Sequence, residues 1–167
     1  HKAFSLDVVK RAATLVKGEP IALKGGALFI GMLPKATTQA DDTDGLYDII
    51  SHLKQEIPCI KTHKMPIHPS DEDIAEAVKK ARFVSQVILT TYNANVYQSQ
   101  IQLINALAEC DVECHVIAMR NPYDLMFTDQ IKHFVCLYKY TPNAITTLIQ
   151  YLKGDLKLEG RIPVTYA

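Results

Sequence analysis

SQVILTTYNANVYQSQIQLINALA, residues 85–108, is the stretch that decides the fold. It begins with an apolar run, residues 87–89, that two threonines continue, which is typical of a strand buried on both faces of a parallel sheet. A polar turn interrupts the run, and Asn93 or Asn95 is suited to cap a helix. Apolar residues then recur at helical spacing over residues 97–108. The stretch therefore predicts half of a βαβ unit. Its turn lies at the carboxyl end of a strand, where α/β sheets usually expose their binding edge.

Similar units flank this stretch on both sides. Apolar runs predict further strands at residues 27–32, 59–63, 114–119 and 133–138, and a last edge strand at 160–166. A first helix is expected at residues 3–17, and a second from a cap at residues 41–43 to Leu53. A third should run from a capping box of Ser70 and Asp73 to Arg82, and a last from Thr141-Pro142 to Gly154. This alternation predicts a doubly wound, mostly parallel α/β sheet of about five or six strands with helices on both faces.

Length and composition narrow the class of protein. A chain of 167 residues fits a single domain, 1–167, that buries roughly 70% of its unfolded surface. Lys plus Arg and Asp plus Glu number 18 each, so the basic surface of a nucleic-acid-binding protein is missing. No apolar run reaches the roughly 18 residues that span a bilayer, so no membrane span is expected. The chain starts without Met or a signal peptide, and we expect it to be a piece of a longer protein.

The four cysteines predict neither a disulfide scaffold nor a metal site. Cys59 and Cys136 lie in apolar, strand-like runs, where a buried thiol is expected. Cys110 and Cys114, followed by His115, lack the Cys-x-x-Cys spacing of zinc ligands, and no second ligand pair stands at the distance of such a site. We therefore expect no metal and no cofactor.

Familiar catalytic and nucleotide-binding motifs are also missing. Neither Gly-x-Gly-x-x-Gly nor a P-loop follows a predicted strand, and Gly25-Gly26 precedes its strand rather than following it. No Gly-x-Ser-x-Gly elbow is present, and Ser99 falls within a predicted helix. Cys114 and His115 alternate to opposite faces of a strand, so they cannot form a nucleophile and base pair.

Residues 120–124, Arg-Asn-Pro-Tyr-Asp, form the loop with the most chemical functionality. In one interpretation Asn121 and Asp124 satisfy the backbone of a turn, while Arg120 pairs with Asp124 or Asp129. In the other, the loop binds a polyol, because fixed polar groups and an aromatic face such as Tyr123 hold sugars. The residues alone favour the first interpretation and leave the second open.

One edge of the predicted sheet gathers several of these side chains. His63, Lys64, Asn93, Arg120 and Tyr123 would all emerge along it. Each by itself is typical of a surface or interface residue. Their grouping makes this edge the best candidate for a functional face.

Three segments together resemble the C-terminal α/β domain of family 3 glycoside hydrolases. Residues 12–19, AATLVKGE, are similar to the opening helix of that domain and the turn that follows it. Residues 120–124 resemble the Asn-Pro-Tyr-Asp loop of the bacterial β-N-acetylhexosaminidase branch. The end of the chain, Leu152-Lys-Gly and then Gly160-Arg-Ile-Pro-Val, resembles the close of the family domain. The matches stand in the expected order and cover nearly the whole chain.

The resemblance implies a parent protein in which a (β/α)₈ barrel precedes this sheet. In the hexosaminidase branch the aspartate nucleophile and the His-Asp acid/base pair belong to the barrel, and no segment here matches those motifs. In the β-glucosidase branch the C-terminal domain supplies the acid/base glutamate. Glu109 and Glu113 bracket a helix-to-strand turn at the opposite edge of the sheet and are no counterpart. No catalytic residue is therefore expected in this chain.

The expected function is an accessory one. The chain would pack on the barrel of the same parent and line the site of a sugar that contains N-acetylglucosamine, with contacts from Asn93, Arg120, Asn121, Tyr123 and Asp124. The alternative is an autonomous carbohydrate-binding or protein-interaction domain that has lost the barrel. A small enzyme that acts alone is the third possibility.

Overall fold

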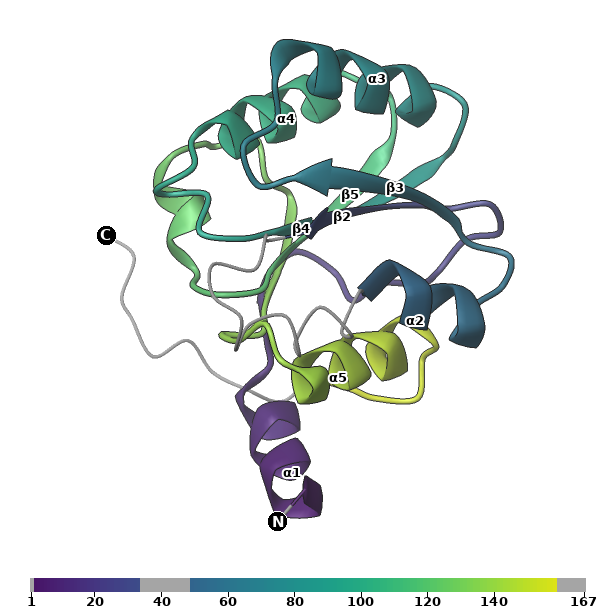
Figure 1. The fold of residues 1–167 in the computed structure, drawn as a ribbon, viewed down its shortest axis with the longest axis vertical. Coiled ribbons are helices and arrows are strands. Elements are labelled where there is room, and N and C mark those ends of the chain that lie inside the picture. The colour runs from purple at the N-terminus through teal and green to yellow at the C-terminus, as the bar shows by residue number, and fades with distance from the viewer. Residues whose placement is uncertain (1, 34–48, 159–167) are drawn as a thin grey trace, which may run out of the picture.

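The computed structural model describes residues 2–33 and 49–158, in which strands and helices alternate (Figure 1). The strands are β1 Thr14–Lys17, β2 Leu28–Leu33, β3 Lys61–Pro66, β4 Gln86–Thr91, β5 Glu113–Ala118 and β6 His133–Cys136. The helices are α1 Lys2–Ala12, α2 Ile49–Glu56, α3 Asp71–Ala81, α4 Ser99–Ala108 and α5 Pro142–Leu152, with a 3₁₀ helix, η2, at Tyr123–Met126. The predicted α/β fold is confirmed.

All six strands form one sheet in the order β1-β6-β5-β4-β2-β3. Strands β2 to β6 are parallel, and β1 runs antiparallel to β6 at one edge. All six residues of β4 are buried, as expected for a strand with neighbours on both sides and helices on both faces. The edge strand expected at 160–166 and the helix cap expected at 41–43 lie outside the described residues.

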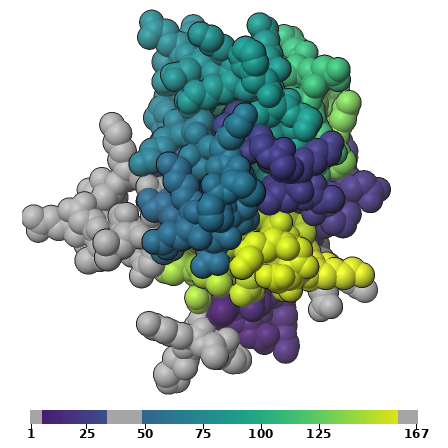
Figure 2. All heavy atoms as spheres, turned by 90° about the vertical axis from the view of Figure 1, so that its right-hand side faces the viewer, coloured from purple at the N-terminus to yellow at the C-terminus, as the bar shows by residue number. Residues whose placement is uncertain are grey.

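Helices cover both faces of the sheet, and each face has its own core. Figure 1 shows α3 and α4 above the sheet and α2 and α5 below it. Phe29, Ile88 and Ile117 point to the lower core with α2 and α5, while Leu89 and Val116 point to the upper core. Figure 2 shows α5 packed between α2 and the N-terminal helix α1. The alternation of apolar side chains along each strand therefore serves two cores at once.

The N-terminal segment differs from the sequence expectation. Residues 3–17 were expected to be one helix, but α1 ends at Ala12 and Thr14–Lys17 pair with β6. Thr14 and Val16 are β-branched, which favours the extended conformation at the free edge of β6. Gly18 follows with a φ of 78°, a left-handed conformation that suits glycine and ends the strand. A short apolar run fits either a helix or a strand, so periodicity alone misassigned it.

Strand β3 and the helix caps complete the comparison with the sequence. The strand lies at Lys61–Pro66 rather than 59–63, so Cys59 is exposed in the preceding turn and its predicted burial is wrong. Pro66 ends a strand at the sheet edge, where a missing N–H costs no ladder bond. The capping box of Ser70 and Asp73 is confirmed, with bonds of 2.8 and 3.1 Å. Helix α5 begins at Thr141-Pro142 as predicted, with Thr141 as its cap.

The sheet has two ends with different surroundings. The parallel strands point to the left in Figure 1, so the loops after β4 and β5 form what we call the carboxyl edge. The connections that enter these strands form the amino edge. No helix in the described part of the chain is long and apolar enough to cross a membrane.

Candidate functional site

Four of the five predicted site residues come together at the carboxyl edge. Asn93 follows β4, and Arg120, Asn121 and Tyr123 follow β5, the neighbouring parallel strand. Because parallel strands end on the same side, the two loops lie next to each other there. A hydrogen bond of 2.9 Å from Asn121 Nδ2 to Asn93 Oδ1 joins them.

The asparagines form a network that holds both loops. Asn121 Nδ2 also lies 3.3 Å from Asn95 Oδ1, and Asn121 Oδ1 accepts from the Tyr123 backbone N–H at 3.2 Å. Asn93 has a φ of 52°, and its carbonyl accepts from the N–H groups of residues 96 and 97. The prediction that Asn93 or Asn95 caps the next helix is wrong, because α4 begins only at Ser99 and has no side-chain cap. Asparagine tolerates the left-handed turn, and its amide ties the loop to its neighbour.

Arg120 lies over an aromatic ring instead of forming the expected ion pair. Its guanidinium carbon is 5.6 Å from the centre of the Tyr92 ring, and Tyr92 meets Tyr140 edge to face. Within the described ranges no salt bridge joins Arg120 to Asp124 or Asp129. The exposed guanidinium thus makes a cation–π contact with Tyr92.

Asp124 is buried, unlike the other four predicted site residues. It is 1% exposed, and its Oδ2 accepts a hydrogen bond of 2.6 Å from Thr91 Oγ1. Burial raises the pKa of Asp124 from its ordinary 3.8 to about 6, and the bond from Thr91 offsets only part of that rise. The prediction of a direct sugar contact is therefore not supported by its position. The carboxyl group anchors η2 to the end of β4.

Apolar side chains are exposed on the loop that carries part of this polar network. Because Asp124 and Leu125 face inward, the same helical turn exposes Tyr123 and Met126, and Phe127 follows. Met126 is 68% exposed and Phe127 44%. No periodic pattern in the sequence predicts this surface, since η2 is a single turn within a loop. Large apolar groups exposed together are a feature of interaction surfaces.

Two other predicted residues do not reach this edge. His63 and Lys64 lie in the middle of β3 rather than beyond its end. His63 Nδ1 is 2.8 Å from Lys80 Nζ on α3, and partial burial followed by the Lys80 charge lowers the pKa of His63. Placing the strand two residues too early in the sequence caused this error.

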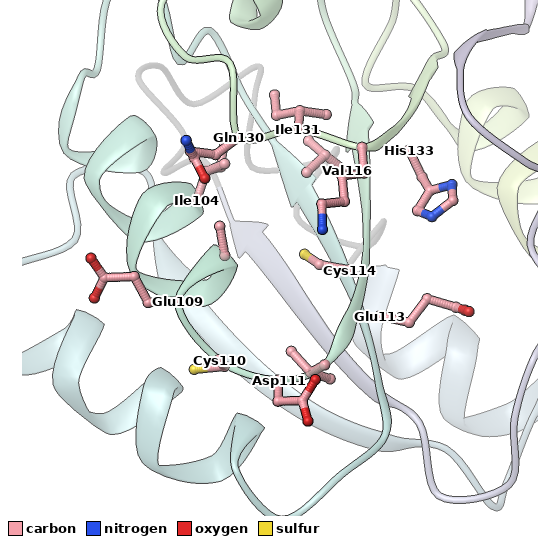
Figure 3. Close-up of a pocket in the computed structure, with 13 residues that line it drawn as sticks. Ile104, Glu109, Cys110, Asp111, Glu113, Cys114, Val116, Gln130, Ile131 and His133 are labelled. Atoms are coloured by element: carbon pink, nitrogen blue, oxygen red, sulfur yellow. The ribbon is translucent and has the colours of Figure 1, made fainter.

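The amino edge contains a hollow of about 420 Å³ between the end of α4 and the starts of β5 and β6 (Figure 3). Glu109 and Glu113 both line it, but Figure 3 shows them pointing in opposite directions. Cys114 is also part of the lining, and burial raises its pKa to about 12, so it is no reactive thiolate. Two carboxyl groups that face apart cannot act on one glycosidic bond, which agrees with the expectation from the sequence.

Among residues 2–33 and 49–158, no three His, Cys, Asp or Glu side chains gather in a group that could hold a metal ion. The carboxyl edge instead offers amides, a guanidinium and aromatic rings. These groups suit hydrogen bonding to a neutral, hydroxyl-rich ligand.

No protein-family model and no curated protein sequence matches the chain. Several solved structures match it. A family 3 β-N-acetylglucosaminidase from Paenibacillus sp. matches with a TM-score of 0.84 and 25% identity, over 96% of this chain and 32% of the enzyme chain. A fungal multi-domain family 3 β-N-acetylglucosaminidase matches with a TM-score of 0.73 and 21% identity, over 100% and 20% of the two chains.

A β-glucosidase from Listeria innocua has the same fold, with a TM-score of 0.71, 14% identity, and coverage of 97% and 27%. The chain thus spans about a third or less of the proteins it matches. The resemblance to a domain of family 3 glycoside hydrolases is confirmed along nearly its whole length.

Proposed function

We propose that residues 1–167 form the C-terminal accessory domain of a family 3 enzyme of the β-N-acetylhexosaminidase type. The domain packs on a (β/α)₈ barrel of the same protein and lines the sugar site with its carboxyl edge. The observation that carries the proposal is the match to the Paenibacillus β-N-acetylglucosaminidase, at 25% identity along 96% of this chain and 32% of that one. A domain of this size leaves most of such an enzyme, including its barrel, to other parts of the chain.

The carboxyl edge supports a role in sugar binding. Asn93, Asn95 and Asn121 form a fixed amide network, and Arg120 is positioned above Tyr92. Sugars are bound by convergent polar groups whose geometry is set in advance, beside an aromatic surface. We assign the contacts to Asn93, Arg120, Asn121 and Tyr123, with Asp124 as the buried anchor of their loop.

The exposed apolar rim supports contact with another domain. Met126 and Phe127 lie on the loop that carries Arg120 and Tyr123, so a partner that covers them would also meet the polar network. Hydrolysis needs two carboxyl groups that flank one bond, and Asp124 is buried against Thr91. We therefore assign the chemistry to the partner domain and none to this chain.

Hydrolysis of a chromogenic β-N-acetylglucosaminide tests the proposal in two purified proteins, this chain alone and the full-length protein from its gene. Activity is expected only in the full-length protein. Turnover by the chain alone would overturn the accessory role. A full-length protein without a barrel, together with binding of free N-acetylglucosamine by the chain, would favour an autonomous binding domain instead.

Arg120→Ala in the full-length protein tests the sugar contact. A hydrogen bond from a charged group contributes about 1.5–3 kcal/mol, so kcat/KM should fall by about 10-fold to 100-fold. Arg82→Ala is the matched control, because Arg82 is exposed at the end of α3, at the amino edge. Equal kcat/KM values for the two variants would show that Arg120 does not contact the sugar.

A further inference from the structure

Residues 18–27, which we call the strap, join β1 to β2 across the amino edge. Strand β1 runs antiparallel to the rest of the sheet, so its end and the start of β2 both lie at this edge, with β6, β5 and β4 between them. Figure 2 looks onto this edge, and the strap crosses its surface in indigo between α5 and the upper helices. The strap therefore passes the starts of three buried strands.

The first fastening of the strap is a histidine. The backbone N–H of Glu19 donates to His133 Nδ1, at the start of β6, at 3.0 Å. Gly18 lies so close that a Cβ there would overlap His133 Nδ1 and the Lys132 carbonyl oxygen. His133 Nδ1 can accept this bond only when it carries no proton.

The middle of the strap is fastened by Gln86, the fully buried first residue of β4. Its Oε1 accepts from the Lys24 N–H at 2.9 Å, and its Nε2 donates to the Ala22 carbonyl at 3.0 Å. Gln86 Nε2 also lies 2.6 Å from Glu113 Oε2, and Lys24 Nζ is 3.6 Å from the same carboxylate. Amides do not titrate near neutral pH, so this fastening is insensitive to pH in that range.

A second histidine lies against the first. His115 is buried and stacks on His133 with ring centres 4.4 Å apart and planes 23° from parallel. Its Nε2 lies 2.9 Å from Glu113 Oε2. Burial lowers the pKa of His115, and the charges of His133 and Lys24 lower it further, while Glu113 opposes them. The charged residues near the pair are thus Glu113 on β5, Lys24 and Glu19 on the strap, and Lys132, which precedes His133.

We propose that His133, stacked on His115, is an acid-sensitive latch for the strap. When His133 takes up a proton, both ring nitrogens carry hydrogen, and its Nδ1–H faces the N–H of Glu19. The acceptor becomes a donor and the bond is lost. Acid therefore releases Gly18 and Glu19, while the Tyr151 hydroxyl, which accepts from the Ile21 N–H at 3.0 Å, and Gln86 still hold residues 21–24.

Hydrogen exchange followed by mass spectrometry tests the latch in the folded chain at pH 7.5 and 5.5, after correction for the intrinsic effect of pH on exchange. The Glu19 amide should lose about tenfold in protection at pH 5.5, the effect of one lost hydrogen bond, while the Ile21 amide, bonded to Tyr151, should keep its protection. Peptides from α5 should keep theirs. Unchanged protection of the strap, or an equal loss across strap and α5, would overturn the proposal.

Two variants test whether His133 causes the loss of protection at pH 5.5. His133→Asn keeps an oxygen that can accept from Glu19 but cannot titrate, so its strap should stay protected at both pH values. His68→Asn is the matched control, because His68 is exposed and packs on Tyr97 away from the strap, and it should respond like the unmodified chain. A strap that still opens at pH 5.5 in a folded His133→Asn variant would refute the role of His133. If that variant fails to fold, the pH response of the unmodified chain decides.

Discussion

Replacing Asp124 with asparagine should make the folded chain more stable at neutral pH, although it changes a buried, hydrogen-bonded residue. Asparagine has nearly the same shape, and its Oδ1 can still accept the bond that Thr91 Oγ1 now donates. What the substitution removes is a negative charge in a site that is 1% exposed. Burial of that charge is unfavourable, which is why the pKa of Asp124 rises.

The magnitude follows from the linkage between protonation and folding. The pKa of Asp124 rises from 3.8 in the unfolded chain to about 6 in the folded one. Between these values the unfolded chain is ionised and the folded chain still holds its proton, so stability falls as pH rises. At 1.36 kcal/mol for each pKa unit, the loss is about 1 kcal/mol at pH 4.5 and about 3 kcal/mol at pH 7.5. The advantage of Asp124→Asn should therefore grow by about 2 kcal/mol between these pH values.

Urea denaturation followed by circular dichroism at pH 4.5 and 7.5 measures this difference. Comparing the two pH values cancels any packing cost of asparagine that does not depend on pH. Asp129→Asn is the control, because Asp129 is exposed in the same loop and the substitution removes the same charge from the surface. If the free energy of unfolding of Asp124→Asn differs from that of the unmodified chain by the same amount at both pH values, the reasoning about the buried charge is wrong.

Two further substitutions test the backbone features of the fold by the same denaturation assay. Gly18→Ala should cost about 3 kcal/mol, because φ is unfavourable for alanine there and the new Cβ would overlap the backbone of His133 in β6. Gly26→Ala should cost only about 1 kcal/mol, because its φ of 73° is equally unfavourable but no atom lies near the new Cβ. Equal costs for the two variants would argue against the close approach of Gly18 to β6. Thr141→Ala should cost about 1 kcal/mol, because it removes the acceptor for the Ala144 N–H at the start of α5. A Thr146→Ala change on the exposed face of α5 should cost less than 0.5 kcal/mol, about the usual limit for a surface position, and a larger cost there would show that the cap is not what the assay detects.

Local sequence patterns predicted the features whose cause is local. The apolar run at residues 87–89, the capping box of Ser70 and the Thr141-Pro142 start of α5 each depend on neighbours a few residues away. For the same reason the order of strands and helices was predictable. The N-terminal strand was not, because its extended form depends on pairing with β6 about 120 residues later.

The candidate site was predictable in location but not in detail. Loops after neighbouring parallel strands must share an edge, so Asn93, Arg120 and Tyr123 were expected at the same edge. Which way Asp124 points depends on the turn of η2 and on Thr91, 33 residues earlier. The strap is still harder to predict, because Glu19 meets a histidine 114 residues away. Contacts of this kind leave no periodic trace in the sequence.

Hydroxyl-radical footprinting tests most directly whether the carboxyl edge meets another domain. Met126 is 68% exposed in this chain and carries a readily oxidised thioether. Phe83, which is 80% exposed at the end of α3, lies at the amino edge and serves as the internal reference. The account predicts that Met126 is oxidised readily in the isolated chain and is protected in the full-length protein, while Phe83 reacts equally in both. Equal oxidation of Met126 in the two proteins, or protection of Phe83 instead, would contradict it.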